Sequence, residues 1–359
     1  MKTKYYSLKN ILAKNAQYNV IFGERSNGKT YAVLEYALRN YAETGNQLAI
    51  VRRWQDDFTG KRGATMFDSL VANGVIERLT KSRWTGVYYY GSRWFLCKYE
   101  DDKRIVSDTP FAYGFSISAM EHDKSTSYPN ITTVFFDEFL TRSIYLQDEF
   151  VLFMNVLSTI VRNRTNVKII MCGNTVNKYC PYFAEMGLSH IKSMKPGDID
   201  TYRYGDSDLI VAVEYCAPRK EGKASDIYFA FDNPKLSMIT GGEWEIDIYP
   251  HLPYKYAPKD ILFTYFILFN ASTLQCEIID HDGVIFTYIH RKTSDLKSPS
   301  TDLIYSPEYS PLPNWRRKIT KPSSAIEKRI ASYYVTDKVF YQDNETGEIV
   351  RNYLQWCNS

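Results

Sequence analysis

The amino-acid sequence predicts an α/β fold arranged as two domains, on three observations. At 359 residues the chain exceeds the size at which a single hydrophobic core stops growing. Apolar runs alternate with stretches of helical spacing up to about residue 195. Later in the chain, short apolar runs are separated by turn residues. We expect a domain with a mostly parallel sheet over residues 1–195, a linker region over 196–258 and a smaller α+β domain over 259–359.

The first elements follow from apolar periodicity. Residues 18–22 form the first expected strand, which runs directly into a glycine-containing loop. Residues 29–43 have helical spacing and end at Gly45, a residue type common at helix C-termini. A second buried strand is expected over 48–52, and the aromatic alternation over 86–98 predicts an inserted hairpin.

Three more elements complete the expected N-terminal domain. Residues 132–136 read as an apolar strand that ends in acids, 148–160 as a helix, and 167–172 as a fully buried strand. A change to polar, glycine-containing composition over 192–208 marks the boundary of the domain.

The second domain is expected to open with a β-meander. Its three strands are predicted over 261–270, 276–280 and 284–290, with turn residues between them. A stretch with four prolines over 299–313 separates this meander from a terminal helix expected over 323–334.

The composition fits a folded protein of the cell interior. Hydrophobic residues make up 44% and charged residues 24%, as in globular proteins. The six cysteines form no CxxC or CxH spacing, which disfavours a zinc site and a disulfide framework. No signal-like start and no membrane-spanning apolar run occur. We expect a soluble protein of a reducing cytoplasm, whose net charge of +3 leaves nucleic-acid binding to local patches.

The clearest motif, GERSNGKT, matches the phosphate-binding pattern GxxxxGK[ST] directly between a strand and a helix. Its glycines let backbone N–H groups surround phosphates, and the helix N-terminus adds a positive dipole. Lys29 would reach the β and γ phosphates, and the Thr30 hydroxyl would bind Mg²⁺. We therefore predict ATP and Mg²⁺ binding by Gly23, Glu24, Arg25, Ser26, Asn27, Gly28, Lys29 and Thr30.

A pair of acids supplies the second half of the expected site. Asp137 and Glu138 end the apolar strand over 132–136. The first carboxylate is expected to hold Mg²⁺, and the second to orient and deprotonate the attacking water. This pairing predicts hydrolysis of ATP rather than binding alone.

Hydrolysis also needs further positive charge on the transferring phosphoryl group. The arginine candidates are Arg25, Arg52, Arg53, Arg162 and Arg164. Asn174, just after a predicted strand, is a candidate for sensing the γ-phosphate or holding the water, with a turn asparagine as the alternative.

In combination these residues resemble the genome-packaging motor ATPases of small tailed bacteriophages, the phi29-like family, which are related to terminase large subunits. The resemblance covers roughly residues 15–185. It is carried by VIFG at 20–23, AIVRR at 49–53, KS at 124–125 with YPN at 128–130, FDEF at 136–139 and VRNR at 161–164.

The resemblance implies a RecA-like (ASCE) P-loop ATPase domain followed by an RNase H-like domain that has lost its nuclease chemistry. It also implies a homopentameric ring that translocates double-stranded DNA through the portal of a capsid, in the host cytoplasm, with a scaffold RNA as a further candidate partner. Arg162 would be an arginine finger given to the neighbouring subunit, and Lys124 would face the subunit boundary.

Two expectations follow for DNA. A two-metal nuclease needs converging carboxylates, and the strand over 261–270 carries none, so we predict no cleavage. Contacts to the DNA backbone depend on lysine and arginine. The candidates are Lys61, Arg62, Lys124, Arg316, Arg317, Lys318 and Lys321.

Three alternative functions remain open from the sequence. The chain could be a large terminase with an active C-terminal nuclease, a nucleotide-dependent switch or scaffold without turnover, or a small-molecule kinase. The kinase is disfavoured by the lack of an arginine-rich lid and by the large second domain.

Overall fold

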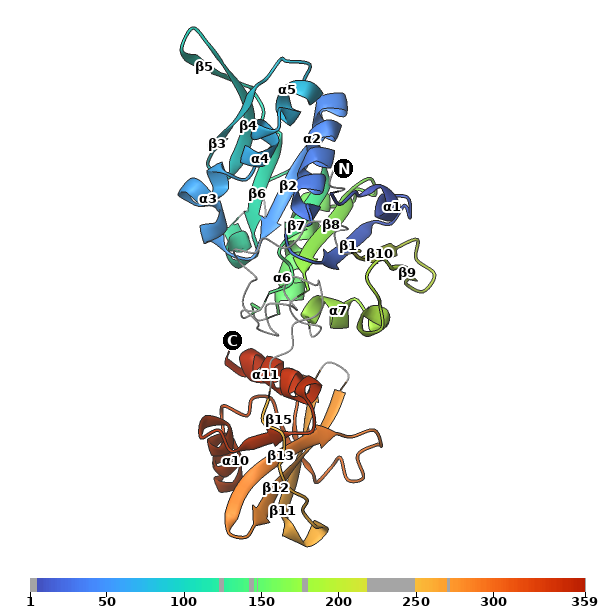
Figure 1. Ribbon diagram of the computed structural model, residues 1–359, viewed down its shortest axis with the longest axis vertical. Helices are drawn as coiled ribbons and strands as arrows, with labels where there is room; N and C mark the ends of the chain where they lie inside the picture. The colour runs from blue at the N-terminus through green and yellow to red at the C-terminus, as the bar shows by residue number, and fades with distance from the viewer. Residues whose placement is uncertain are drawn as a thin grey trace. The chain divides into compact units, whose positions relative to one another are not determined.

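The computed structural model describes residues 5–122, 126–141, 145–146, 148–175, 180–217, 249–269 and 272–358. The chain divides into two compact units, each built round its own sheet (Figure 1). The first unit holds the described residues between 5 and 141 together with 148–175 and 190–217, and the second holds 145–146, 180–189 and 249–358.

The first unit contains a mixed sheet in the order β3-β4-β6-β2-β7-β8-β1-β10-β9, with β5 paired to β4. Neighbours from β6 to β10 in this order are parallel, whereas β3, β4, β5 and β9 pair antiparallel. The strands are β1 (Tyr18–Gly23), β2 (Gln47–Arg52), β3 (Gly86–Tyr90), β4 (Arg93–Glu100), β5 (Lys103–Val106), β6 (Ala112–Ser116), β7 (Ile131–Asp137), β8 (Lys168–Asn174), β9 (Ile199–Arg203) and β10 (Ile210–Tyr215).

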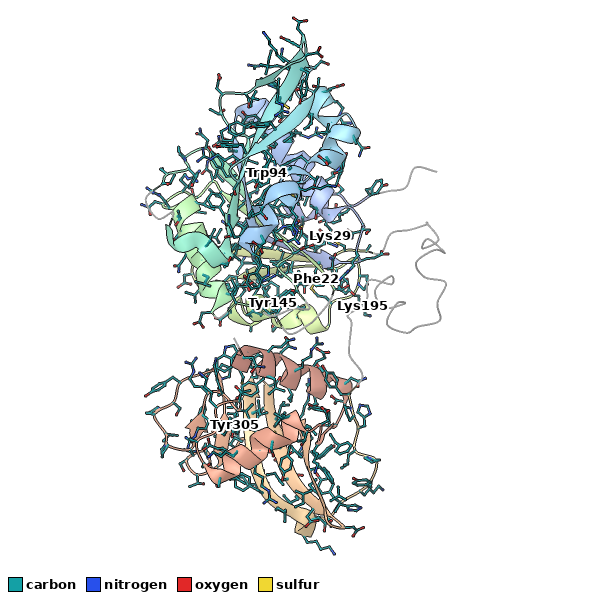
Figure 2. All side chains as sticks on the ribbon, turned by 90° about the vertical axis from the view of Figure 1, so that its left-hand side faces the viewer. Phe22, Lys29, Trp94, Tyr145, Lys195 and Tyr305 are labelled. Carbon is teal, nitrogen blue, oxygen red and sulfur yellow. The ribbon has the colours of Figure 1, made fainter. Side chains whose placement is uncertain are left out.

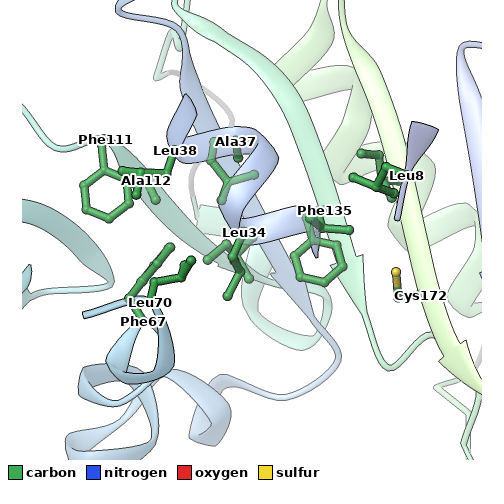
Figure 3. Packing of buried hydrophobic residues seen from close by; sticks show 14 of the residues in the cluster. Leu8, Leu34, Ala37, Leu38, Phe67, Leu70, Phe111, Ala112, Phe135 and Cys172 are labelled. Carbon is green, nitrogen blue, oxygen red and sulfur yellow. The ribbon is translucent and has the colours of Figure 1, made fainter. Parts of the chain in front are cut away.

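Helices cover both faces of this sheet. They are α1 (Lys9–Leu12), α2 (Lys29–Thr44), α3 (Gly60–Ala64), α4 (Asp68–Ala72), α5 (Val75–Leu79) and α6 (Glu149–Val161), with 3₁₀ turns η1 (Gln55–Phe58), η2 (Ile117–His122) and η3 (Ser189–Lys192). Leu34 and Leu38 of α2 share a buried cluster with Phe135 of β7 (Figure 3). The next residue of β7, Phe136, points to the other face and contacts Phe153 of α6, with ring centroids 4.9 Å apart.

Most expected elements of the first unit are confirmed. β1, β2, β7, β8, the hairpin β3–β4 and the helices α2 and α6 lie where apolar periodicity predicted them. Residues 199–215, which we expected in a linker region, instead form β9 and β10. The apolar side chains of β10 are buried beside β1, where Val20 lies opposite Val213. Residues 218–248 of that expected linker lie outside the described residues.

The second unit contains a sheet in the order β15-β14-β11-β12-β13-β16. β11, β12 and β13 form the antiparallel meander that the sequence predicts, whereas β14 pairs parallel to β11, β15 parallel to β14 and β16 parallel to β13. The strands are β11 (Ile261–Phe269), β12 (Ser272–His281), β13 (Val284–Arg291), β14 (Leu303–Tyr305), β15 (Trp315–Arg316) and β16 (Val339–Tyr341).

Helices α10 (Ala325–Val335) and α11 (Asn344–Asn358), with α7 (Pro181–Glu185) and η4 (Pro258–Asp260), complete the described part of this unit. α10 is the helix expected over 323–334, and α11 was not predicted. Ile330 and Tyr353 of these two helices pack with Tyr265, Cys276 and the buried Tyr305 of the sheet, which Figure 2 labels. Among the described residues, no helix has both the length and the hydropathy needed to cross a bilayer.

Candidate nucleotide-binding site

The loop between β1 and α2 has a backbone that depends on glycine. Gly23 has φ +152° and Gly28, the N-cap of α2, has φ +94°. A Cβ at Gly23 would lie 2.9 Å from the Cβ of Cys216. Ser26 also has a positive φ of +58°. The loop therefore adopts a conformation that the two glycines of the motif allow and that most other residues would strain.

Lys29 fills the interior of this loop, at the end of β1 marked by Phe22 in Figure 2. Its ammonium donates to the carbonyls of Gly23 (3.2 Å) and Glu24 (2.7 Å) and to Oδ1 of Asn27 (3.3 Å). It also lies 3.4 Å from Oδ1 of Asn174, at the end of β8. The side chain is buried, and burial lowers its pKa. An anion bound in the loop would favour the charged form of this lysine.

The loop and the first acid of the pair meet at one edge of the sheet. β8 lies between β1 and β7 and pairs with both in parallel, so Gly23 is level with Asn174, and Asp137 with Cys172. The Thr30 hydroxyl donates to Oδ1 of Asp137 at 3.1 Å. Burial raises the pKa of Asp137, opposed chiefly by the charge of Arg52. Two oxygen donors suited to a hard cation thus lie side by side.

Arg52, the last residue of β2, binds both acids. Its guanidinium donates to Oδ2 of Asp137 at 2.6 Å and to Oε2 of Glu138 at 2.8 Å. Glu138 has φ +60°, an uncommon backbone for a non-glycine residue, and its side chain is 64% exposed. The sequence indicates Arg52 as a source of positive charge for phosphate, whereas the structure places it on the two carboxylates.

Arg53 points elsewhere and is buried. It makes two short bonds to the carboxylate of Glu149, the first residue of α6, at 2.7 and 2.8 Å. It also donates to the carbonyls of Glu138 (3.3 Å) and Phe139 (2.9 Å). Sequence reasoning missed Glu149, although a carboxylate at the start of a helix after the acid pair was a visible signal.

Arg162 and Arg164, which follow α6, have different surroundings. Arg164 donates to five backbone carbonyls, those of Tyr128, Pro129, Ile131, Ile160 and Val161, at 2.6 to 3.3 Å. Arg162 is exposed, has φ +51° and donates to the carbonyl of Thr126 at 3.0 Å. Arg164 is therefore committed to holding the chain at the start of β7, and Arg162 is presented to solvent.

Other candidate residues are placed as follows. Arg25 is exposed on the phosphate loop. Lys61 and Arg62 are exposed on α3, a short helix where we expected a loop, and Arg62 lies 3.9 Å from Asp57. Lys124 lies outside the described residues.

The basic run of the second unit is partly engaged. Arg316 is bound to Glu327 at 3.0 Å, so it is a weaker DNA candidate than the sequence indicated. Arg317 and Lys318 each lie 5.4 Å from the ring centroid of Trp356, and Lys321 is exposed. Within the part of the chain that the structure describes, no group of three or more His, Cys, Asp or Glu side chains is placed to hold a metal ion.

Comparisons with known proteins find relatives among phage DNA packaging proteins. Residues 1–195 match the family model of the podovirus DNA encapsidation protein (Gp16). The chain is 22% identical to the DNA packaging proteins of Bacillus phages PZA and phi29, over 85% of this chain and 83% of each relative.

Two solved structures share the fold over nearly the whole chain. The Phi-28 gp11 DNA packaging motor aligns with a TM-score of 0.59 at 16% identity, over 100% of this chain and 99% of that one. The bacteriophage Phi-29 viral genome packaging motor assembly aligns with a TM-score of 0.57 at 17% identity, over 98% and 99%. With more than half of its length matched by the family model, this chain belongs to the podovirus DNA encapsidation protein (Gp16) family.

Proposed function

We propose that this DNA encapsidation protein is the ATP-hydrolysing subunit of a packaging motor, which translocates viral double-stranded DNA into a preformed capsid. The contact between Thr30 and Asp137 carries the proposal. It joins the phosphate loop after β1 to the acid that ends β7, and so brings both halves of an ATPase motif to one edge of the sheet.

The strand order supports a RecA-like P-loop fold. β8 separates the loop strand β1 from the acid strand β7, and its own end carries Asn174 beside Lys29. In the proposed site, Glu138 directly follows Asp137, the acid that would bind magnesium. In this proposal Asn174, 3.4 Å from the Lys29 ammonium, senses the γ-phosphate rather than serving as a turn asparagine.

Lys29, Thr30 and Asp137 are the residues that would hold a magnesium–ATP complex, because they offer an ammonium inside the loop and two neighbouring oxygen donors. Bound Mg²⁺ would supply positive charge beside the β and γ phosphates. The remaining loop residues, Gly23 to Gly28, would contribute backbone N–H groups.

Glu138 acts as general base in this proposal, taking a proton from the water that attacks the γ-phosphate. Its Oε2 atom accepts a 2.8 Å bond from the Arg52 guanidinium, and a lone pair engaged in that bond cannot take up a proton from water. Arg52 must therefore release Glu138 before the proton can move. The exposed side chain of Glu138 leaves it room to do so.

Arg162 is assigned to the nucleotide of a neighbouring copy. Arg164, two residues later, binds the carbonyl of Ile131 at the start of β7, whereas Asp137 ends that strand and Glu138 follows it. At roughly 3.3 Å per residue the two ends lie roughly 20 Å apart, farther than an arginine side chain reaches. An exposed arginine so placed can serve a phosphate only in trans.

This assignment supports a closed ring of identical subunits, as do the folds shared with two packaging motors. We propose a homopentamer that contacts double-stranded DNA and the phage portal, with a scaffold RNA as a further partner. Lys61, Arg317, Lys318 and Lys321 are the described DNA candidates that remain without a carboxylate partner within 4 Å among the described residues.

The substitution Glu138→Gln tests the proposed chemistry. We expect steady-state ATP turnover to fall by about 10²- to 10⁴-fold, the usual contribution of a general base, while binding of a non-hydrolysable ATP analogue is retained. Glu43→Gln, at the exposed end of α2, is the matched control and should leave turnover unchanged.

Unchanged turnover in Glu138→Gln would remove the role given to this residue. A wild-type chain that binds ATP in assembled rings and never hydrolyses it would instead favour the alternative function, a nucleotide-dependent switch.

A further inference from the structure

Arg53 and Glu149 form a buried ion pair next to the main chain of Glu138. Neither residue has a part in the hydrolysis proposed so far. Both side chains are almost fully shielded from solvent, at 7% and 0% exposure. Two bonds of 2.7 and 2.8 Å join the guanidinium to the two carboxylate oxygens. Removing one partner of such a pair leaves an uncompensated buried charge, so the two residues act as a unit.

Arg53 also donates to the chain that carries Glu138. The guanidinium donates to the carbonyl of Glu138 at 3.3 Å and to that of Phe139 at 2.9 Å. From the other side, the Phe139 N–H donates to the carbonyl of Cys172 at the end of β8. The peptide that follows Glu138 is thus held from two directions.

This support explains an unusual backbone. Glu138 has φ +60°, a conformation that costs a non-glycine residue free energy and persists only where the surroundings impose it. Its side chain is exposed while its main chain is fixed. The Glu138 side chain can therefore rotate while its main chain stays in place.

We propose that Arg53, anchored by Glu149, is a positioning residue for ATP hydrolysis. It fixes the Glu138–Phe139 peptide and so determines where the Glu138 carboxylate can reach once Arg52 releases it. This inference rests on the proposed role of Glu138 as general base. The alternative is that the pair only ties β2 to α6 and stabilises the fold.

The test compares variants of the full-length chain. Replacing both partners, Arg53→Met with Glu149→Leu, removes the two charges of this ion pair together. We expect this variant to bind a non-hydrolysable ATP analogue within about twofold of the wild-type Kd. We expect its kcat to fall about tenfold or more with KM little changed, because the general base is misplaced.

Arg53→Lys is the conservative companion. A lysine can pair with Glu149, but its ammonium cannot reproduce the planar fork that also reaches the two carbonyls. We expect it to fold and bind the analogue, with an intermediate loss of kcat. The pair Arg291→Met with Glu345→Leu is the matched control, since these residues form a 2.8 Å ion pair in the second unit, and it should leave basal turnover unchanged.

Glu138→Gln, measured in parallel, distinguishes a failure of the proposed general base from a failure of the positioning role of Arg53. Active Glu138→Gln would remove the proposed function itself. Inactive Glu138→Gln together with Arg53 variants that turn over within twofold of wild type would overturn the positioning role alone. Loss of analogue binding in both Arg53 variants would also overturn it, because the pair would then act on the fold rather than on Glu138.

Discussion

Arg162 and Arg164 are two positions apart, yet their surroundings give them different tasks. Arg164 holds five carbonyl oxygens where α6 ends and β7 begins, and burial lowers its pKa. Arg162 makes one bond to a carbonyl and is exposed. The motif VRNR therefore combines one arginine that stabilises the fold with one that faces outward.

Arg164→Ala should destabilise the first unit by about 2 kcal/mol, since charge-assisted bonds to several carbonyls are lost together. Arg162→Ala should change the free energy of unfolding by less than about 0.5 kcal/mol, as is usual for an exposed side chain. Urea denaturation followed by fluorescence gives both values. A larger effect for Arg162 than for Arg164 would contradict these assignments.

The sequence identified most of the candidate site at the level of single residues. Lys29, Thr30, Asp137 and Glu138 follow from local motifs whose flanking strand and helix are themselves visible in the sequence. The choice among the arginines was not predictable. Whether an arginine meets a carboxylate, a carbonyl or solvent depends on which strands lie side by side, and Arg52 meets Asp137 only because β2 pairs with β7.

Among the elements, strands buried on both faces were the most predictable. β1, β2, β7 and β8 have near-continuous apolar runs, as parallel strands covered by helices require. The helices α3, α4 and α5 are each five residues long, too short for an apolar period to repeat. β9 is a polar edge strand, and β14 to β16 have only two or three residues each, so tertiary pairing rather than local pattern defines them.

In the sheet of the second unit, β14 adds parallel to the first strand of an antiparallel meander. β11 carries no carboxylate. Glu277 of β12 is bound to Tyr256 (2.5 Å) and Gln275 (2.6 Å). Burial alone would raise the pKa of Glu277, but hydrogen bonds from His290, Tyr256 and Gln275 outweigh it and lower the pKa. Glu277 is therefore bound within a hydrogen-bond network of the second unit.

We therefore expect no DNA cleavage by the second unit. Supercoiled plasmid incubated with the full chain and Mn²⁺ should remain intact on an agarose gel, since a two-metal nuclease needs several converging carboxylates. Cleavage that disappears when residues 249–359 are deleted would instead identify a terminase with an active nuclease.

At the scale of the whole molecule, the trans assignment of Arg162 predicts complementation between two inactive chains. Arg162→Ala keeps a complete phosphate loop, and Lys29→Ala keeps the arginine. Each alone should have little ATPase activity, and mixing them should restore part of it at shared interfaces. Steady-state turnover against mixing ratio is the measurement.

The matched control replaces the second partner with a chain that carries both substitutions. This mixture supplies no arginine from outside and should stay inactive. Recovery there, or full activity of Arg162→Ala alone, would show that the arginine is not provided in trans.

The position of helix α6 has a consequence for the order in which neighbouring subunits hydrolyse ATP. Its first residue, Glu149, is bound to Arg53, which also donates to the carbonyl of Glu138, and its last residue precedes Arg162. If Arg162 contacts the nucleotide of the neighbouring subunit, then one helix of roughly 20 Å connects the nucleotide sites of two subunits. A movement of Arg162 when the neighbouring subunit loses its phosphate would then displace Glu149 at the other end of α6. We therefore expect successive subunits to hydrolyse ATP in sequence rather than independently.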